Sequence, residues 1–432
     1  MKILIVTTYF PPQNSIASLR PYSWAKWWSK AGHEVTVLTT LKSKRKTDLN
    51  LDHSGFKVIS LPVPFISNTS YVYQNAITNN RKSIFMILSF IKKCYTTFAQ
   101  KTGCFYKARF PDFHDLWAKK AIKKIFHINF DLIISTGGPY SVHRVGLAMK
   151  KKYPETKWIV DWRDLWVDNH LFKGLKIFWF YERFLEEKYH KNTDLITIVS
   201  EPLADIIRRM TKTRVEVVYN GFDSEDYIKI KQKVRKKNNS FTIVYTGTIY
   251  KGYQDPSPLF EAVTNLKRNN LLAEGSLKLI FAGGNTDVTD IAEYYNISEF
   301  YTYLGFLPRE DALQLQYDAD AVLFLEYNDP SVPGILTGKL FEYMSLAQEI
   351  IAIGINEVTT ADKIINDTKT GLCFGNDVKK IEEYLITRII NKIKCNLKKD
   401  ENIIQEFERN NQAIKLLNYL TIGDNKKRLT PS

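Results

Sequence analysis

The sequence predicts an α/β fold made of two Rossmann-like domains, each with a parallel sheet flanked by helices. Short apolar runs alternate with stretches of helical periodicity, which is typical of a doubly wound parallel sheet. This alternation stops at a polar, lysine-rich stretch over residues 229–240 and then begins again. The 432 residues also exceed the usual size of one hydrophobic core. We therefore predict an N-terminal domain over 1–228, a linker over 229–240 and a second domain over 241–400.

The remaining residues, 401–432, are predicted to form a C-terminal helix and a polar tail. For this segment we consider packing against the N-terminal domain.

The N-terminal domain opens with a strand, a loop containing two prolines and a helix. Ile3–Thr8 is a largely apolar run, as expected for a strand buried on both faces. Proline stops regular pairing, and a helix is then predicted from about Ala17 to Ala31. Ligands bind parallel α/β sheets at the carboxyl ends of the strands. The loop residue Ser15 and the helix residue Arg20 are therefore candidates for ligand contacts.

Residues 81–130 interrupt the alternation and carry much of the positive charge. They hold eleven Lys and Arg against two Asp, a net charge of +9 within the chain's +15. Apolar residues from Ile84 to Phe98 recur at helical spacing, and a second basic helix is predicted over Leu116–Phe126, so basic amphipathic helices span about 81–127. Such helices favour an anionic membrane surface. A helix that covers the sheet and leaves its lysines in water explains the pattern equally well.

Two later strands lead into loops with the residue types of an active site. The strand over 131–135 precedes a glycine loop and a helix, and the strand over 158–160 precedes a loop with two carboxylates and an arginine. The ligand-binding candidates are Gly138, Ser141 and His143, and the catalytic candidates are Asp161, Arg163 and Asp164. An exposed carboxylate at a strand end can accept a proton from an attacking hydroxyl. A salt-bridged loop packed on tryptophans is the structural alternative.

The second domain places glycine-containing loops after three of its strands. The candidate ligand-binding residues on these loops are Gly247, Thr248, Lys251, Gly283, Gly284, Gly338, Lys339 and Glu342. Gly338 lets the backbone approach a ligand, and Lys339 adds a cation near a helix start, where a phosphate can bind. Glu342 lies one turn further on, where a carboxylate can bind the hydroxyls of a ribose. A helix start with a solvated lysine and glutamate is the alternative.

Several classes of site are not expected. The four cysteines lack metal-ligand or redox spacing, which predicts free thiols in a reducing compartment. No G-x-G-x-x-G is present, which argues against a dinucleotide oxidoreductase. No Asp-x-Asp occurs in the glycine-containing loops of the second domain, so we expect neither a metal nor another cofactor. The apolar start is too short for a signal peptide and no apolar run reaches membrane-span length, which predicts a cytoplasmic protein.

Short motifs occur in a consistent order along nearly the whole chain. They are Phe10-Pro11-Pro12 with Arg20, Gly32–Val37, Asp161–Trp166, Asn220–Asp223, Gly305–Glu310 and Lys339–Tyr343. In this order they resemble the nucleotide-sugar glycosyltransferases of GT-B fold, which have two facing Rossmann-like domains. The resemblance is specifically to the retaining family-four, or "group 1", class.

The resemblance implies that the candidates of the second domain bind the nucleotide-sugar donor. It places five candidates of the first domain on the acceptor side: Ser15, Arg20, Gly138, Ser141 and His143. It also implies roles for individual residues. Glu342 matches the glutamate that binds the donor's ribose, and Lys251 matches the lysine that neutralises the donor pyrophosphate. Thr248 stands closest to the place of the family's arginine, so Lys339 is expected to supply the absent charge. Gly334 replaces the first glutamate of the family's E-x7-E pattern, which leaves the donor sugar undefined. Asp161 occupies the place of a histidine in the catalytic region of many relatives.

The expected function is transfer of a sugar, with retention, from a nucleoside diphosphate sugar to a saccharide acceptor. The basic segment suits a lipid-linked acceptor in bacterial surface polysaccharide synthesis, and it predicts peripheral binding to the anionic inner face of the plasma membrane. A nucleotide-sugar epimerase of the same fold is one alternative. A nonenzymatic protein that binds an anionic surface or nucleic acid is another. We expect no nucleic-acid partner, because the charge lies on amphipathic helices rather than on a nucleic-acid-binding motif.

Overall fold

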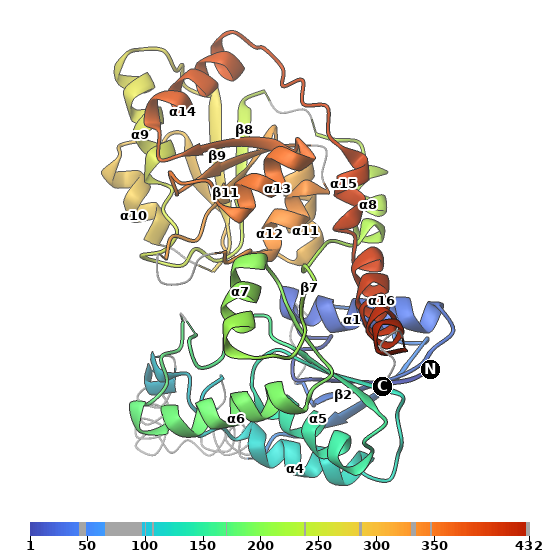
Figure 1. Ribbon diagram of the computed structural model, residues 1–432. Helices are drawn as coiled ribbons and strands as arrows, with labels where there is room; N and C mark the ends of the chain where they lie inside the picture. The colour runs from blue at the N-terminus through green and yellow to red at the C-terminus, as the bar shows by residue number, and fades with distance from the viewer. Residues whose placement is uncertain are drawn as a thin grey trace, which may run out of the picture. The chain divides into compact units, whose positions relative to one another are not determined.

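The computed structural model describes residues 1–42, 49–64, 97–99, 101–105, 108–169, 171–236, 239–284, 287–329, 334–345 and 348–428. These residues form two compact units (Figure 1). The first contains Met1–Tyr219 together with Ala413–Ser432, and the second contains Asn220–Gln412. Each unit is built on one parallel sheet flanked by helices, which confirms the predicted fold class. The division falls after Tyr219, whereas the linker was predicted at 229–240.

The first unit has a seven-stranded sheet in the order β3-β2-β1-β4-β5-β6-β7. Its strands are β1 (Lys2–Thr7), β2 (Glu34–Thr40), β3 (Lys57–Leu61), β4 (Leu132–Thr136), β5 (Lys157–Asp161), β6 (Leu195–Ile198) and β7 (Val215–Val217). Its helices are α1 (Ile16–Lys30), α4 (His114–Ile125), α5 (Ser141–Lys152), η1 (Lys176–Phe178), α6 (Trp179–Asn192), α7 (Glu201–Met210) and most of α16 (Arg409–Arg428).

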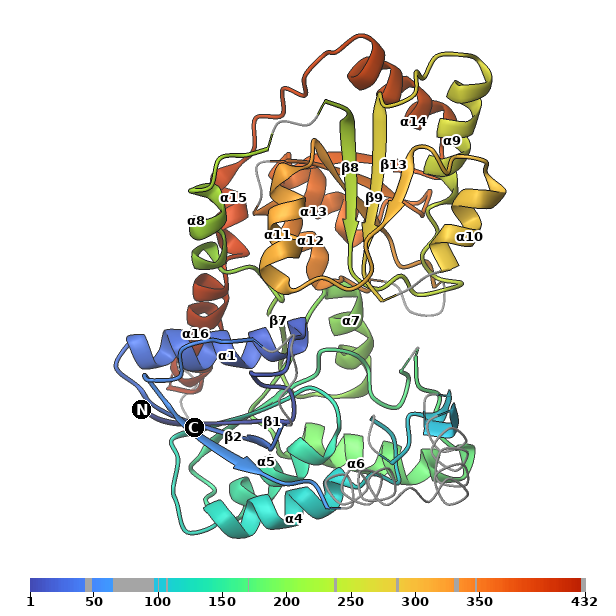
Figure 2. The same cartoon turned by 180° about the vertical axis from the view of Figure 1, so that it is seen from behind.

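Two layers of helices cover the two faces of this sheet. α1 and α16 lie side by side on one face, where the indole Nε1 of Trp28 donates to the carbonyl oxygen of Ala413 at 3.0 Å (Figures 1 and 2). Ala413 and Leu416 are fully buried in the same core as Trp24 and Trp28. α4, α5 and α6 form the layer on the opposite face. The last helix of the chain therefore completes the core of the first unit.

The two basic helices predicted in the interrupted segment have different outcomes. The helix expected over Ile84–Phe98 lies almost entirely outside the described residues. The second is α4, most of whose apolar residues are buried against the sheet and α5 while Lys119, Lys120, Lys123 and Lys124 are exposed. Most of its apolar face is thus used within the unit, and its lysines face outward together with Leu116. No helix among the described residues is both long and apolar enough to span a bilayer.

The second unit has a six-stranded sheet in the order β10-β9-β8-β11-β12-β13. Its strands are β8 (Phe241–Thr246), β9 (Leu277–Ala282), β10 (Tyr301–Tyr303), β11 (Ala321–Leu325), β12 (Glu349–Ile353) and β13 (Gly371–Gly375). Its helices are α8 (Ser224–Lys231), α9 (Ser257–Arg268), α10 (Asp287–Tyr294), α11 (Arg309–Asp318), α12 (Gly338–Met344), α13 (Thr360–Thr368), α14 (Val378–Leu385), η2 (Ile386–Ile390) and α15 (Glu401–Glu406).

The strand order of each unit reverses at one point. In the first unit this point lies between β1 and β4, and in the second it lies between β8 and β11. In the second unit α9, α10 and α14 cover one face of the sheet and α11, α12 and α13 cover the other (Figure 2). The loops at the carboxyl ends of the strands beside a reversal diverge to opposite faces and leave a ligand-binding position between them. The fold therefore gives each unit one favoured place for a site.

Candidate functional site

Two glycine loops of the second unit pack directly against each other at the end of its sheet. A Cβ atom added at Gly283, after β9, would lie 1.9 Å from the carbonyl oxygen of Gly247, after β8. Gly247 has a φ of +120°, and a Cβ there would lie 2.3 Å from Cε of Lys339. No side chain fits at either position without displacing backbone or the lysine. The glycines thus allow the lysine of α12 to lie over the loop that follows β8.

Lys339 is a desolvated cation bound only to neutral groups. Its Nζ donates to the hydroxyl oxygen of Tyr245 at 2.6 Å and to the carbonyl oxygen of Thr248 at 3.0 Å. Burial lowers the pKa of Lys339 to about 8, and Glu342 only partly opposes this shift. No carboxylate of the described chain forms an ion pair with this ammonium group. An anionic ligand is the partner that such a group requires, because a buried charge is stabilised by an opposite charge.

Glu342 lies on the same helix as Lys339 but is held by a network of its own. Its Oε2 accepts from Nη1 of Arg309 at 2.9 Å, and its Oε1 accepts from Nε2 of Gln316 at 2.8 Å. Arg309 also donates from Nη2 to Asp226 at 2.8 Å. The Glu342 side chain is 15% exposed, so the carboxylate is fixed in orientation and still accessible at one edge. A carboxylate can accept about four hydrogen bonds, which leaves capacity for a ligand.

Arg309 and Gln316 were not predicted as site residues. Both are on α11, at 33 and 26 residues from Glu342 in the sequence. Arg309 falls within the Gly305–Glu310 motif, so its neighbourhood carried a signal, but nothing in the spacing indicated its partner. The contact exists because α11 and α12 lie on the same face of the sheet.

The other residues predicted to bind the donor make fewer contacts with Lys339 and Glu342. The Lys251 side chain is 81% exposed and forms an ion pair with Asp287 at 3.1 Å, so it is not part of the Lys339 cluster. Thr248 contributes its carbonyl oxygen, while the residue itself is exposed, as is Gly284. Gly338 is the first residue of α12, as expected. The structure thus gathers Gly247, Gly283, Lys339 and the Thr248 backbone into one cluster, with Glu342 on the same helix.

In the first unit Arg163 lies at the reversal point of the sheet. Its guanidinium carbon is 5.0 Å from the centroid of the Tyr9 ring, after β1, and the group packs on the Cα of Gly137, after β4. Its Nη1 donates to the carbonyl oxygen of Ala17 at 3.2 Å. Its Nε is buried and has no hydrogen-bond partner among the described residues. A guanidinium with an unused donor at this position can bind an oxyanion or a hydroxyl.

The expectation of an exposed, proton-accepting Asp161 is wrong. The residue is fully buried, and its carboxylate accepts from Nε and Nη2 of Arg20 at 3.1 and 2.8 Å. The hydroxyls of Thr136 and Thr197 donate to it at 2.5 and 2.7 Å. Burial by itself raises the pKa of Asp161, but Arg20 and these hydrogen bonds outweigh burial and hold the pKa below its ordinary value. Asp161 and Arg20 therefore form a structural ion pair, with no face open to an acceptor.

Two acceptor-side predictions are also corrected. Ser141 and His143 are fully buried on α5. The His143 ring lies 4.1 Å from the Trp162 ring and its Nδ1 is 2.8 Å from the hydroxyl of Ser135. Burial lowers the pKa of His143 to about 3, so the imidazole is neutral. These side chains belong to the core under the site, because α5 turns them toward the sheet.

The remaining residues on this side have mixed roles. Ser15 caps α1, where its hydroxyl accepts from the backbone N–H of Ser18 at 3.3 Å. The carbonyl oxygen of Gly138 accepts from the hydroxyl of Thr8 at 3.1 Å, which joins the loops after β4 and β1. Asp164 is exposed. Among the described ranges, no cluster of three or more His, Cys, Asp or Glu side chains is arranged to hold a metal ion. Metal independence stays a prediction.

Two parallel-sheet units in one chain, each with a ligand-binding position at its reversal point, define the GT-B class of glycosyltransferase fold. Residues 18–221 match the family described as "Glycosyl transferase 4-like domain", and residues 226–409 match "Glycosyl transferases group 1". The chain therefore belongs to the group 1 glycosyltransferases of GT-B fold. It is an enzyme that uses a nucleotide-sugar donor and a sugar acceptor.

Solved structures show the same fold at low sequence identity. A sucrose-phosphate synthase from Thermosynechococcus elongatus is 12% identical with a TM-score of 0.62, and the match covers 98% of both chains. A UDP-forming trehalose-phosphate synthase from Burkholderia xenovorans is 10% identical with a TM-score of 0.63, covering 97% of this chain and 99% of that one. A lipopolysaccharide outer core galactosyltransferase is 12% identical with a TM-score of 0.54, covering 98% and 99%. No curated protein matches the chain by sequence.

Proposed function

We propose that this enzyme transfers a sugar, with retention, from a nucleoside diphosphate sugar held by the second unit to a lipid-linked saccharide acceptor held by the first. The observation that carries the proposal is Lys339, a desolvated ammonium over the glycine loop after β8 that contacts only neutral oxygens. A diphosphate supplies the missing negative charge. We expect that no metal ion is needed to neutralise the diphosphate, because a lysine and loop N–H groups can stabilise its negative charge.

We assign different parts of the donor to Lys339 and to Glu342. Lys339 binds the diphosphate, and it replaces the arginine that the family carries near the position of Thr248. Glu342 binds the ribose hydroxyls through the edge of its carboxylate that Arg309 and Gln316 leave open. These two partners fix the carboxylate before the donor arrives, which lowers the entropy lost on binding.

The reaction breaks the bond between the anomeric carbon and the β-phosphate oxygen and forms a bond from that carbon to the acceptor hydroxyl oxygen. The hydroxyl proton leaves with the nucleoside diphosphate or with water. Negative charge grows on the leaving phosphate, so a cation at Lys339 stabilises the transition state more than the ground state. We assign no protein nucleophile and no protein base, because Asp161 is buried and fully hydrogen-bonded.

Arg163 is the residue that we assign to the acceptor. Its unpartnered Nε lies at the reversal point of the first sheet, and a guanidinium recognises phosphate oxygens well. A saccharide linked to a lipid through phosphate satisfies this chemistry, and so does a free sugar phosphate. The complex of the Burkholderia xenovorans trehalose-phosphate synthase with glucose-6-phosphate makes the second class worth testing. The basic outer lysines of α4 favour the lipid-linked class, in bacterial surface polysaccharide assembly at the inner membrane face.

A thermal-shift screen with UDP, GDP, ADP and CDP tests the donor site first. A ligand that binds the folded state raises the melting temperature. We expect a shift with one nucleotide that is lost in Glu342→Ala and in Lys339→Met. The matching sugar nucleotides are then incubated with polyprenyl-diphosphate saccharides or sugar phosphates, and the products are analysed by mass spectrometry and by NMR for the anomeric configuration. Unchanged turnover in EDTA is expected. Sugar isomers formed without any acceptor would support the epimerase instead.

A further inference from the structure

Five apolar side chains are exposed together on the segment that leads into α6 and on the first half of that helix. Phe180 is 87% exposed, Ile177 81% and Phe184 54%. Trp179 and Leu171 are 42% and 36% exposed. Single exposed apolar residues are common on protein surfaces, but a contiguous group usually marks an interaction site. We call this group, Leu171, Ile177, Trp179, Phe180 and Phe184, the aromatic patch.

The patch occupies positions where an ordinary surface helix carries polar residues. The buried side of α6 consists of Glu182, Leu185, Glu186, Tyr189 and His190. Phe180 and Phe184 are four residues apart and therefore share the opposite, outward face. The second half of that face carries Glu187 and Lys191, as expected for a solvated helix. The outward face of α6 thus changes from aromatic to charged along its length.

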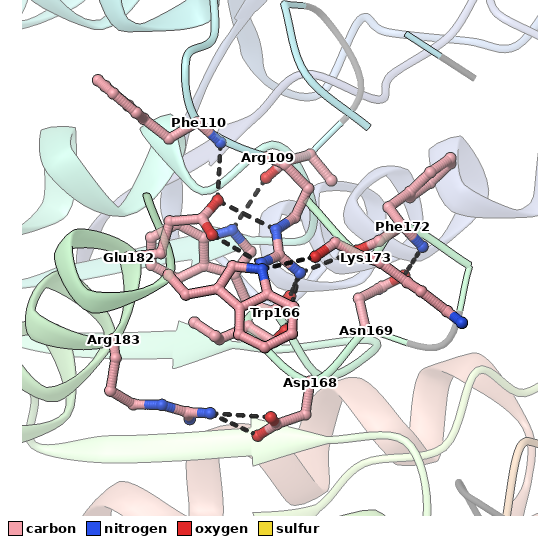
Figure 3. Close-up of polar contacts among 12 residues, drawn as sticks. Arg109, Phe110, Trp166, Asp168, Asn169, Phe172, Lys173, Glu182 and Arg183 are labelled. Atoms are coloured by element: carbon pink, nitrogen blue, oxygen red, sulfur yellow. Dashed lines mark hydrogen bonds and ion pairs between the residues drawn. The ribbon is translucent and has the colours of Figure 1, made fainter. Parts of the chain in front are cut away.

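A buried anchor holds this segment in place from below. Arg109 is fully buried and forms a two-point ion pair with Glu182 of α6, at 3.0 and 2.6 Å (Figure 3). Its Nη1 also donates to the carbonyl oxygens of Val167 and Phe172, both at 2.8 Å. The Asn169 side chain accepts from the backbone N–H of Phe172 at 2.9 Å. One arginine therefore fixes both the loop and the helix that carry the exposed apolar residues.

The surroundings of the patch are basic. Lys173 and Lys176 are exposed within the same segment, and Lys191 is exposed further along α6. The carboxylates of α6 are already occupied by basic partners: Glu182 by Arg109, Glu186 by Arg183 and Glu187 by Lys191. α4 lies in the same helical layer and adds four exposed lysines. Arg183 is shared with the exposed Asp168, so four carboxylates in all lie in this region. The basic residues number six, and the local charge is therefore positive: Arg109, Lys173, Lys176, Arg183, Lys188 and Lys191.

From these observations we infer that the aromatic patch with Lys173 and Lys176 is the surface by which the enzyme docks on an anionic phospholipid bilayer. Aromatic side chains settle at the boundary between headgroups and acyl chains, while adjacent lysines pair with lipid phosphates. A protein partner fits less well, because lysine is depleted from protein–protein interfaces. The inference deepens the proposed function, since it rests on a lipid-linked acceptor for its role in catalysis.

Vesicle flotation tests the inference on the whole protein. The probes are vesicles of phosphatidylcholine alone and vesicles with one third phosphatidylglycerol. Wild type should bind the anionic vesicles, and the double variant Phe180→Ser/Phe184→Ser should bind them at least tenfold more weakly. Lys173→Gln/Lys176→Gln should weaken binding about thirtyfold, since each of the two lysines near an anionic surface contributes about 1 kcal/mol. The loss should shrink at high salt.

Two matched controls lie in the second unit. Tyr294→Ser removes an aromatic residue that is 83% exposed, and Lys392→Gln/Lys394→Gln removes two exposed lysines with the same change in net charge. Both controls should bind the anionic vesicles as wild type does. Equal binding by wild type and by the phenylalanine variant would overturn the inference. A wild-type dimer that becomes monomeric in that variant, without vesicle binding, would assign the patch to a second copy of the chain and overturn it as well.

The hypothesis of the membrane-docking surface and the hypothesis of the donor site can be refuted independently of each other. Nucleotide binding by the phenylalanine variant should equal that of wild type, because both phenylalanines belong to the first unit whereas Lys339 and Glu342 belong to the second. Vesicle binding without any nucleotide shift in wild type would contradict the proposed function and leave the docking surface supported. The reverse result would contradict only the docking surface.

Discussion

Replacing Lys339 by methionine removes the cation and keeps most of the side-chain volume. In the ligand-free enzyme the ammonium group donates to Tyr245 and to the Thr248 carbonyl, and burial lowers its pKa from 10.5 to about 8. That difference corresponds to about 3 kcal/mol against the charged form in the folded protein. A bound diphosphate reverses this effect, so the lysine gains a partner only when the donor is present.

The expected loss of affinity follows from this geometry. A hydrogen bond to a charged group contributes about 1.5–3 kcal/mol, so Lys339→Met should weaken nucleoside diphosphate binding by about 10- to 100-fold at pH 7. Wild-type affinity should fall as the pH rises through 8, by roughly tenfold per pH unit, because the ligand then has to recruit a proton. The variant should lack this dependence.

Isothermal titration calorimetry with the nucleotide selected by thermal shift, at pH 7, 8 and 9, measures both effects. The matched control is Lys278→Met, an exposed lysine near the start of β9, away from the carboxyl ends of the strands. The folded pKa of Lys339 lies below its unfolded value, so wild type gains stability between pH 8 and 10.5 and the ligand-free variant should be no less stable at pH 7. Equal affinity, or the same pH dependence in both proteins, would refute the role of Lys339.

Three further predictions concern the ion pairs and the acceptor. Arg309→Leu leaves the carboxylates of Asp226 and Glu342 without their shared partner, and urea unfolding should show that the free energy of unfolding falls by about 3–5 kcal/mol. A smaller fall than in Arg309→Lys would contradict this prediction. Asp161→Asn breaks the ion pair with Arg20, so it should lower the free energy of unfolding by about 3 kcal/mol at pH 7 and not affect turnover alone. The lowered pKa of Asp161 means that this contribution is present above pH 4 and disappears as the pH falls through the folded value, so wild type and variant should converge in acid. Arg163→Ala should raise the KM for a phosphate-containing acceptor about tenfold in steady-state assays, and an altered nucleotide affinity would point to misfolding instead.

The sequence by itself determined the architecture and the positions of the glycine loops at the strand ends. Buried parallel strands appear as continuous apolar runs, and Ile3–Thr8 was identified in this way. Gly338 followed by Lys339 at a helix start indicated the loop whose lysine packs on Gly247. β3 was not predicted, because it lies at the sheet edge with half-exposed residues and no clear apolar pattern. Local patterns report burial and backbone freedom, which depend on neighbours in the sequence.

Only the tertiary structure decided which charged residues are available for chemistry. Asp161 stands at a strand end, as a catalytic residue should, but Arg20 reaches it across 141 positions and closes it off. Glu342 depends on Arg309, and Glu182 depends on Arg109, through contacts between distant elements. The exposure of Phe180 and Phe184 has the same origin, since packing of α6 through its other face turns them outward. Strand order and helix faces set these pairings, and sequence spacing does not encode them.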